Sequence, residues 1–125
     1  MITGILDTAI LIDFLRGYSR AVQWLSSNPD IAITPIVKFE ILDGAANVKE
    51  LRHSLKMLKQ FQMVDLMPDD IEWALTQFTL YKLSHNVGSM DCLIASTAFR
   101  LQVPLYTRNL KHFAPMLGGL AQQPY

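Results

Sequence analysis

The first part of the chain alternates between short apolar runs and segments with helical spacing. Ile2–Leu6 has the apolar continuity of a buried strand, and Ala9–Arg16 has the spacing of a helix that ends at Gly17. Ser19 is a suitable N-cap for a second helix. This opening predicts a strand followed by two helices.

A second strand is predicted over Ile31–Thr34. Thr34 is a suitable N-cap for the helix that follows, and Pro35 is a suitable first residue; this helix carries Glu40 and ends near Gly44. Farther on, a stripe of leucines beside a basic stripe predicts a helix with a solvated face. The two stripes are Leu51, Leu55 and Leu58, and Lys49, Arg52, Lys56 and Lys59.

The second half continues the alternation. Phe61–Leu66 predicts a third strand and Val103–Thr107 a fourth. Between them, one predicted helix begins at Pro68 and a second opens at Asp91. The inward face of the first helix is expected to contain Ile71, Ala74, Leu75 and Phe78. That of the second is expected to contain Ile94, Thr97, Ala98 and Leu101. Because parallel strands need crossover connections, this order predicts an α/β fold with a mostly parallel sheet covered by helices on both faces.

The composition is that of one globular domain over residues 1–125, without repeats or linkers. Hydrophobic residues make up 50% of the chain. They lie in runs shorter than the roughly 20 residues needed to cross a bilayer, and Asp7 and Asp13 interrupt the N-terminal stretch. We therefore expect a cytoplasmic protein without a membrane anchor. The single Cys92 excludes an intramolecular disulfide.

Charge is balanced overall but uneven along the chain. The 11 basic and 11 acidic residues cancel, which argues against a protein that coats nucleic acid by bulk electrostatics. The segment after Asp91 contains no acidic residue and carries Arg100, Arg108 and Lys111. These three are either candidate phosphate-binding residues or ordinary solvated side chains.

Three acids, Asp7, Glu40 and Asp91, follow predicted strands or lie early in predicted helices. In α/β proteins the carboxyl ends of strands and the first turns of the next helices meet in the ligand-binding crevice. Converging carboxylates stay ionised together only around a cation, so the pattern predicts a site for Mg²⁺ or Mn²⁺. Each acid also has a structural interpretation, as an N-cap, a surface residue or a favourable first-turn charge.

Other residues are secondary candidates for the same site. Thr8 and Thr107 end apolar strands, where a hydroxyl either orients a ligand or caps a helix. Asp13 and Asp43 are possible replacements for one of the three acids. One cysteine and three histidines without metal-ligand spacing argue against zinc.

Four segments taken together resemble PIN-domain ribonucleases, specifically the VapC-like toxins of prokaryotic toxin–antitoxin pairs. The segments are Leu6–Ile12 with Asp7, Phe39–Gly44 with Glu40, Met90–Ala95 with Asp91, and Leu105–Phe113. The resemblance covers essentially the whole chain. It implies a three-layer α/β/α sandwich of four to five strands. It also implies a metal-dependent endoribonuclease that hydrolyses RNA, with Asp7, Glu40 and Asp91 as the catalytic ligands of Mg²⁺.

A fourth acidic residue that members of this family often supply is missing here. The last segment offers only Asn109 and His112, which argues against a second metal ion. Asn109 is a candidate to bind the metal ion through its amide oxygen or through a water, and His112 is a candidate to contact a phosphate. The alternative for each residue is that it only satisfies local backbone groups. The missing acid leaves open a second interpretation, a catalytically weakened PIN-like module that binds RNA or protein.

The resemblance also implies two protein partners, a small antitoxin that blocks the crevice and a second copy of the chain. Phe14, Leu15 and Trp24 either form an apolar groove for a partner helix or belong to the core. A third class of function, phosphoryl transfer through Asp7, requires a second aspartate two residues later, where this chain has Ala9. Glycine-rich nucleotide-binding turns are absent from the sequence.

Overall fold

A five-stranded sheet lies at the centre of the computed structural model, which describes all 125 residues. The strands are β1 (Gly4–Leu6), β2 (Ile31–Ile33), β3 (Gln62–Met63), β4 (Leu105–Tyr106) and β5 (Ala121–Gln122). They lie in the order β3-β2-β1-β4-β5, and each neighbouring pair is parallel. The prediction of a parallel sheet of four to five strands is confirmed.

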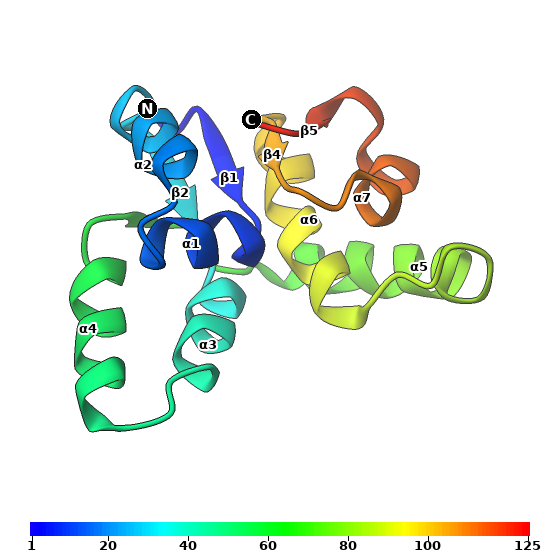
Figure 1. Cartoon of the computed structure of the whole chain (residues 1–125). Coiled ribbons are helices and arrows are strands. Elements are labelled where there is room, and N and C mark those ends of the chain that lie inside the picture. The colour runs from blue at the N-terminus through cyan, green and yellow to red at the C-terminus, as the bar shows by residue number, and fades with distance from the viewer.

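Seven α-helices and one short 3-10 helix connect the strands (Figure 1). They are α1 (Thr8–Leu15), α2 (Ser19–Ser26), α3 (Pro35–Asp43), α4 (Val48–Leu58), α5 (Pro68–His85), α6 (Ser89–Leu101), α7 (Leu110–Leu117) and η1 (Gly118–Leu120). Helix α1 contacts α2 and α3, and α3 contacts α4, whereas α5, α6 and α7 contact one another. Contacts between α3 and α6 join these two groups.

Helices cover both faces of the sheet. Successive residues of a strand point to opposite faces, and every residue of β1 and β2 is buried. The hydrophobic core is one cluster of 23 buried residues drawn from the sheet and from the helices around it. The three-layer architecture is therefore confirmed. None of the helices combines the length and the hydropathy needed to span a bilayer.

The chain changes direction across the sheet at β1. It first adds β2 and β3 on one side of β1 and later adds β4 and β5 on the other. In an open parallel sheet, ligands bind beyond the carboxyl ends of the strands at the point where the strand order reverses. Here that point lies between β1 and β4, where Asp7 and Thr107 follow the two strands.

Most predicted elements are present, with shifted ends. Thr34 caps α3, because its hydroxyl accepts a hydrogen bond from the Val37 N–H at 3.3 Å, and Pro35 is the first residue. Tyr18 rather than Ser19 is the N-cap of α2. The third strand keeps only Gln62–Met63 of the predicted run. The face of α6 that includes Ile94, Thr97 and Ala98 is buried, as predicted.

Helix α5 buries part of the face predicted for it. Ala74 is buried and Phe78 packs against the core, as predicted, whereas Ile71 and Leu75 are 54% and 65% exposed. Asp70 is also buried, because it pairs with Arg100 of α6 at 3.0 Å, and α5 packs mainly along α6. Hydrophobicity alone does not predict that this acidic residue faces inward.

The solvated basic face predicted for α4 is confirmed, because all four of its basic residues, Lys49, Arg52, Lys56 and Lys59, are exposed. Of the leucine stripe beside it, Leu58 is buried, whereas Leu51 and Leu55 are exposed. Among the other helices, α4 packs mainly against α3, so little of its surface is covered.

Candidate active site at the ends of β1 and β4

Asp7 lies at the junction of β1 and α1, beside the end of β4. Its side chain is buried, and two donors hold its carboxylate. Oδ1 accepts a hydrogen bond from the Thr8 backbone N–H at 2.8 Å, and Oδ2 accepts one from the Thr107 hydroxyl at 2.8 Å. Residues that follow β1 and β4 thus fix the orientation of the Asp7 carboxylate.

Thr107 is itself held from three sides. It is fully buried, and its backbone N–H donates to the Gln122 carbonyl at 2.9 Å. Its hydroxyl donates to Asp7 and accepts from the backbone N–H of Asn109 at 2.9 Å. The predicted supporting role of Thr107 thus has a structural counterpart in an oriented hydroxyl.

Glu40 reaches the same region from α3. The Thr8 hydroxyl donates a hydrogen bond to Glu40 Oε1 at 2.5 Å. Helix α3 packs against α1, so an exposed glutamate on its second turn leans toward the first residue of α1. Thr8 therefore contacts both acids, Asp7 through its N–H and Glu40 through its hydroxyl.

Asp91 approaches from the first turn of α6, next to α7. Its Oδ2 lies 3.4 Å from Nδ1 of His112. The same Nδ1 lies 2.8 Å from Nδ2 of Asn109. A chain of polar contacts therefore links Asp7 to Asp91 through Thr107, Asn109 and His112.

The electrostatics of Asp7 reflect this crowding. Burial raises the pKa of the Asp7 carboxyl from 3.8 to about 6, and the negative charges of Asp91 and Glu40 add to the rise. The hydrogen bonds from Thr107 and Thr8 act in the opposite direction. The charges of Glu40 and Asp91 thus both act on the buried carboxylate of Asp7.

The three acids do not form a compact metal cage in this structure. No group of three His, Cys, Asp or Glu side chains is arranged to hold a metal ion directly. Like charges repel, and each carboxylate is close to a different polar partner: Asp7 to Thr107, Glu40 to Thr8 and Asp91 to His112. The donor chemistry nevertheless fits a hard dication, because it consists mainly of carboxylate and hydroxyl oxygens.

Two of the three predicted phosphate-binding residues have partners within the protein. Arg100 bonds Asp70 and the carbonyl of Asp65, at the opposite end of α6 from Asp91. Arg108 bonds both carboxylate oxygens of Asp13 at 2.9 and 3.1 Å. Lys111 is exposed on α7, which also carries His112.

Sequence reasoning missed one polar cluster near the site. Asp13 is buried and accepts hydrogen bonds from Arg108 and from the Tyr125 hydroxyl, the latter at 2.6 Å. Burial and the nearby Asp13 carboxylate raise the pKa of the Tyr125 phenol, which keeps it a neutral donor. Both carboxylate oxygens of Asp13 therefore have donors within the protein. The three residues are so far apart in sequence that no local pattern relates them.

The side chains predicted as an apolar groove belong to the core instead. Trp24 packs edge-on against Tyr106 with ring centroids 4.5 Å apart, and Phe14 packs against Phe61 at 6.1 Å. Leu15 packs against the core as well, and it also lines a pocket. The alternative of ordinary core packing is therefore correct for Phe14 and Trp24.

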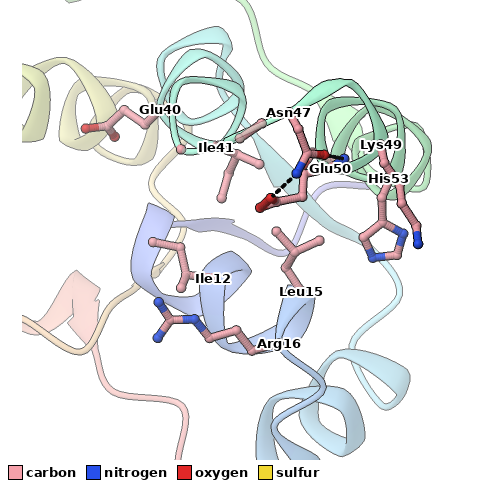
Figure 2. A pocket seen from close by; sticks show the side chains of 12 residues that line it. Ile12, Leu15, Arg16, Glu40, Ile41, Asn47, Lys49, Glu50 and His53 are labelled. Carbon is pink, nitrogen blue, oxygen red and sulfur yellow. Dashed lines mark hydrogen bonds between the residues drawn. The ribbon is translucent and has the colours of Figure 1, made fainter.

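That pocket, of about 590 Å³, lies between α1, α3 and α4 (Figure 2). Ile12, Leu15 and Ile41 form its apolar part, and a charged rim surrounds them. The rim contains Arg16, Glu40, Lys49, Glu50 and His53. In Figure 2 the side chain of Glu40 lies to one side, apart from Glu50 and His53, so one of the three predicted acids belongs to the lining of this pocket.

Comparison with known proteins identifies the architecture. The profile of the PIN domain family matches residues 4–114, a span that includes Asp7, Glu40, Asp91 and Thr107. The chain belongs to the PIN domain family. Among its PIN-domain relatives, ribonuclease VapC1 of Rickettsia felis is 34% identical over 91% of this chain and 90% of its own length. Ribonuclease VapC19 of Mycobacterium tuberculosis is 32% identical over 97% of this chain and 98% of its own length.

Solved structures show the same fold. A toxin–antitoxin complex from Klebsiella pneumoniae contains a chain with a TM-score of 0.81 to this one and 27% identity, covering 98% of both chains. A chain of the DNA-bound VapBC from Salmonella typhimurium has a TM-score of 0.79 at 20% identity, covering 95% of both. The PIN-domain architecture inferred from four short sequence segments is confirmed.

Proposed function

We propose that this PIN-domain protein is a metal-dependent endoribonuclease, the toxin of a toxin–antitoxin pair. The observation that carries the proposal is that Asp91 and Glu40 both act electrostatically on the buried Asp7 at the ligand-binding edge of the sheet. The names of its relatives, ribonuclease VapC1 and ribonuclease VapC19, support RNA as the substrate. A cytoplasmic location, where RNA is available, is part of the same proposal.

Asp7, Glu40 and Asp91 would hold Mg²⁺ or Mn²⁺. The bound ion would supply Lewis-acid activation of a phosphodiester and of a water molecule. Thr107 and the Thr8 N–H orient Asp7, while Thr8 leaves Glu40 Oε2 available to accept a proton from the attacking water.

The outer part of the site would contact the substrate. Lys111 would contact a flanking phosphate at the edge of the site, where His112 Nδ1 lies 3.4 Å from Oδ2 of Asp91. Asn109 connects the inner and outer parts of the site, because its N–H donates to the Thr107 hydroxyl and its amide contacts His112.

The test is cleavage of RNA by the purified, partner-free chain. We expect cleavage with Mg²⁺ or Mn²⁺, none with a chelator, and a loss of more than about 100-fold in Asp7→Asn and Asp91→Asn, since even the outer partners of metal ligands are worth about 10–100-fold. Asp30→Asn, exposed at the opposite end of β2, is the matched control. Equal activity in the three variants would refute the proposal.

The second candidate is a weakened PIN-like module that binds RNA or protein without cutting RNA. The observation in its favour is the pair of Asn109 and His112 in the segment where the family often supplies a fourth acid. RNA binding that persists with chelator, together with no cleavage at any metal concentration, would favour this candidate.

We further propose that the antitoxin docks in the pocket between α1, α3 and α4. The pocket joins an apolar part to charged residues and reaches Glu40, so a bound segment with apolar and charged side chains would also cover the acidic site. The toxin–antitoxin complexes among the structural neighbours support a protein partner. Leu15→Arg should abolish inhibition by the antitoxin and leave RNA cleavage by the free chain unchanged.

A homodimer is the remaining part of the proposal. Ile71 and Leu75 lie one turn apart on α5 and are more than half exposed, which suits contact with another subunit. Light scattering should report a dimer for the purified chain and a monomer for a variant with Ile71→Lys and Leu75→Lys.

A further inference from the structure

A second, smaller pocket lies beside the candidate active site. It has a volume of about 290 Å³ and is lined by Asp13, Tyr18, Arg108, Gln123 and Tyr125. None of these side chains is aliphatic. The pocket therefore offers aromatic rings and hydrogen-bond donors rather than an apolar surface for a peptide side chain.

The two tyrosines of this pocket are held in place. Their rings lie 5.8 Å apart at an angle of 57°. The hydroxyl of Tyr125 bonds Asp13, and the backbone N–H of Tyr18 donates to the Asp13 carbonyl at 2.9 Å, just after Gly17 with its φ of 76°. Tyr18 is 44% exposed, so a fixed ring presents part of its surface to solvent.

Arg108 adds donors to the same pocket. Its Nη1 bonds both oxygens of Asp13, which restrains the guanidinium group. Nε and Nη2 remain for a ligand, and the side chain is 54% exposed. A guanidinium group held in this way binds a phosphate oxygen well, because its geometry is set before the ligand arrives.

The pocket is close to the candidate active site. Arg108 lies between Thr107, which bonds Asp7, and Asn109, which contacts His112. Asp13 follows Asp7 by six residues on α1, about 9 Å along the helix axis. Both α1 and the segment after β4 therefore connect the pocket to the acidic site.

We propose that this pocket binds one nucleotide of single-stranded RNA next to the cleaved phosphodiester, with the base on Tyr18 and a phosphate on Arg108. Stacking of bases on aromatic side chains combined with arginine contacts is the general mode of single-strand recognition. Asp13 neutralises much of the charge of Arg108, so stacking rather than bulk charge supplies the affinity. The inference rests on the proposed function and adds a substrate subsite to it.

The test measures RNA binding separately from cleavage. In an Asp7→Asn background, a fluorescein-labelled single-stranded RNA octanucleotide is titrated in Mg²⁺ with Tyr18→Ala and Tyr18→Phe as the compared changes. We expect Tyr18→Ala to weaken binding at least about fivefold, the lower limit for loss of one base–aromatic stack. Tyr18→Phe, which keeps the ring, should bind as the parent does.

A second measurement reports the contact directly. Ultraviolet crosslinking of the same octanucleotide carrying 5-iodouracil should label the peptides that contain Tyr18 or Tyr125. Equal affinity of the Ala and Phe variants, or crosslinks confined to other peptides, would overturn the inference even if the chain cleaves RNA. A loss of antitoxin binding in Tyr18→Ala with unchanged RNA affinity would overturn it as well, in favour of a protein-binding surface.

Discussion

The hydroxyl of Thr107 donates a 2.8 Å hydrogen bond to Oδ2 of Asp7, and the two residues end adjacent parallel strands. The bond favours the ionised carboxylate and lowers the pKa of Asp7 against the effect of burial. Thr107→Val should therefore reduce cleavage about 10–100-fold, the usual effect of losing an outer partner of a metal ligand.

The same substitution should shift the acid limb of the pH–rate profile upward, because Asp7 would lose a group that stabilises its charge. Thr107→Ser keeps the hydroxyl and is the matched control. A Val variant with an unchanged profile would show that the bond does not orient the catalytic carboxylate.

Asp7 should make the metal-free protein less stable at neutral pH. Its folded pKa of about 6 lies above the ordinary 3.8, so the folded state binds the proton more tightly than the unfolded state. The destabilisation is complete above pH 6 and disappears as the pH falls toward 4. The shift corresponds to about 3 kcal/mol at most, using about 1.4 kcal/mol per pH unit.

The variant Asp7→Asn removes this effect. Denaturant unfolding with a chelator present should give Asp7→Asn a larger free energy of unfolding, relative to the wild type, at pH 7.5 than at pH 4.5. Other carboxyl groups titrate in both proteins, so their contributions cancel in the difference between the two free energies of unfolding. A difference that does not change with pH would contradict the raised pKa.

Divalent cations should stabilise the folded protein through the same acids. A ligand that binds only the folded state adds RT ln(1 + [L]/Kd), about 2.7 kcal/mol at 100 times Kd. Mg²⁺ or Mn²⁺ should therefore raise the Tm of the wild type and lower the pKa of Asp7. Asp91→Asn should lose most of the rise, and Asp30→Asn should keep it. A rise of equal size in both variants would point to a cation bound elsewhere.

Gly4 should tolerate no side chain. A Cβ at this position would lie 2.6 Å from Cε2 of Tyr106, whose ring also packs on Trp24. Gly4→Ala should cost about 1–3 kcal/mol, as overpacking of a well-filled core generally does. Thermal unfolding measures the loss, and Gly119→Ala is the control, because a Cβ there meets no atom within 4 Å. Equal Tm values for the two variants would contradict the packing account.

Four of the five strands could be predicted because the signal of each lies within its own residues, whereas no local pattern predicted β5. A buried parallel strand is a continuous apolar run, and Thr34 and Pro35 mark the start of α3 by their own chemistry. The position of Asp7 directly after such a strand was enough to place it at the ligand-binding edge.

The rest depends on contacts between distant residues. The pairing of Asp70 with Arg100 buries an acidic residue at the start of α5, and the residues near Asp70 in the sequence do not indicate this partner. The pairing of Asp13 with Arg108 likewise joins two residues that no local pattern relates. The side chain of a charged residue can be assigned to a site only when its partner is known.

The most direct test of the central claim is the position of Mn²⁺ in a crystal soaked with that ion. The account predicts one anomalous peak at the carboxyl ends of β1 and β4, within bonding distance of oxygens from Asp7 and Asp91, with Glu40 bound directly or through one water. A peak that contacts neither aspartate, or no peak at a Mn²⁺ concentration that supports cleavage, would contradict it.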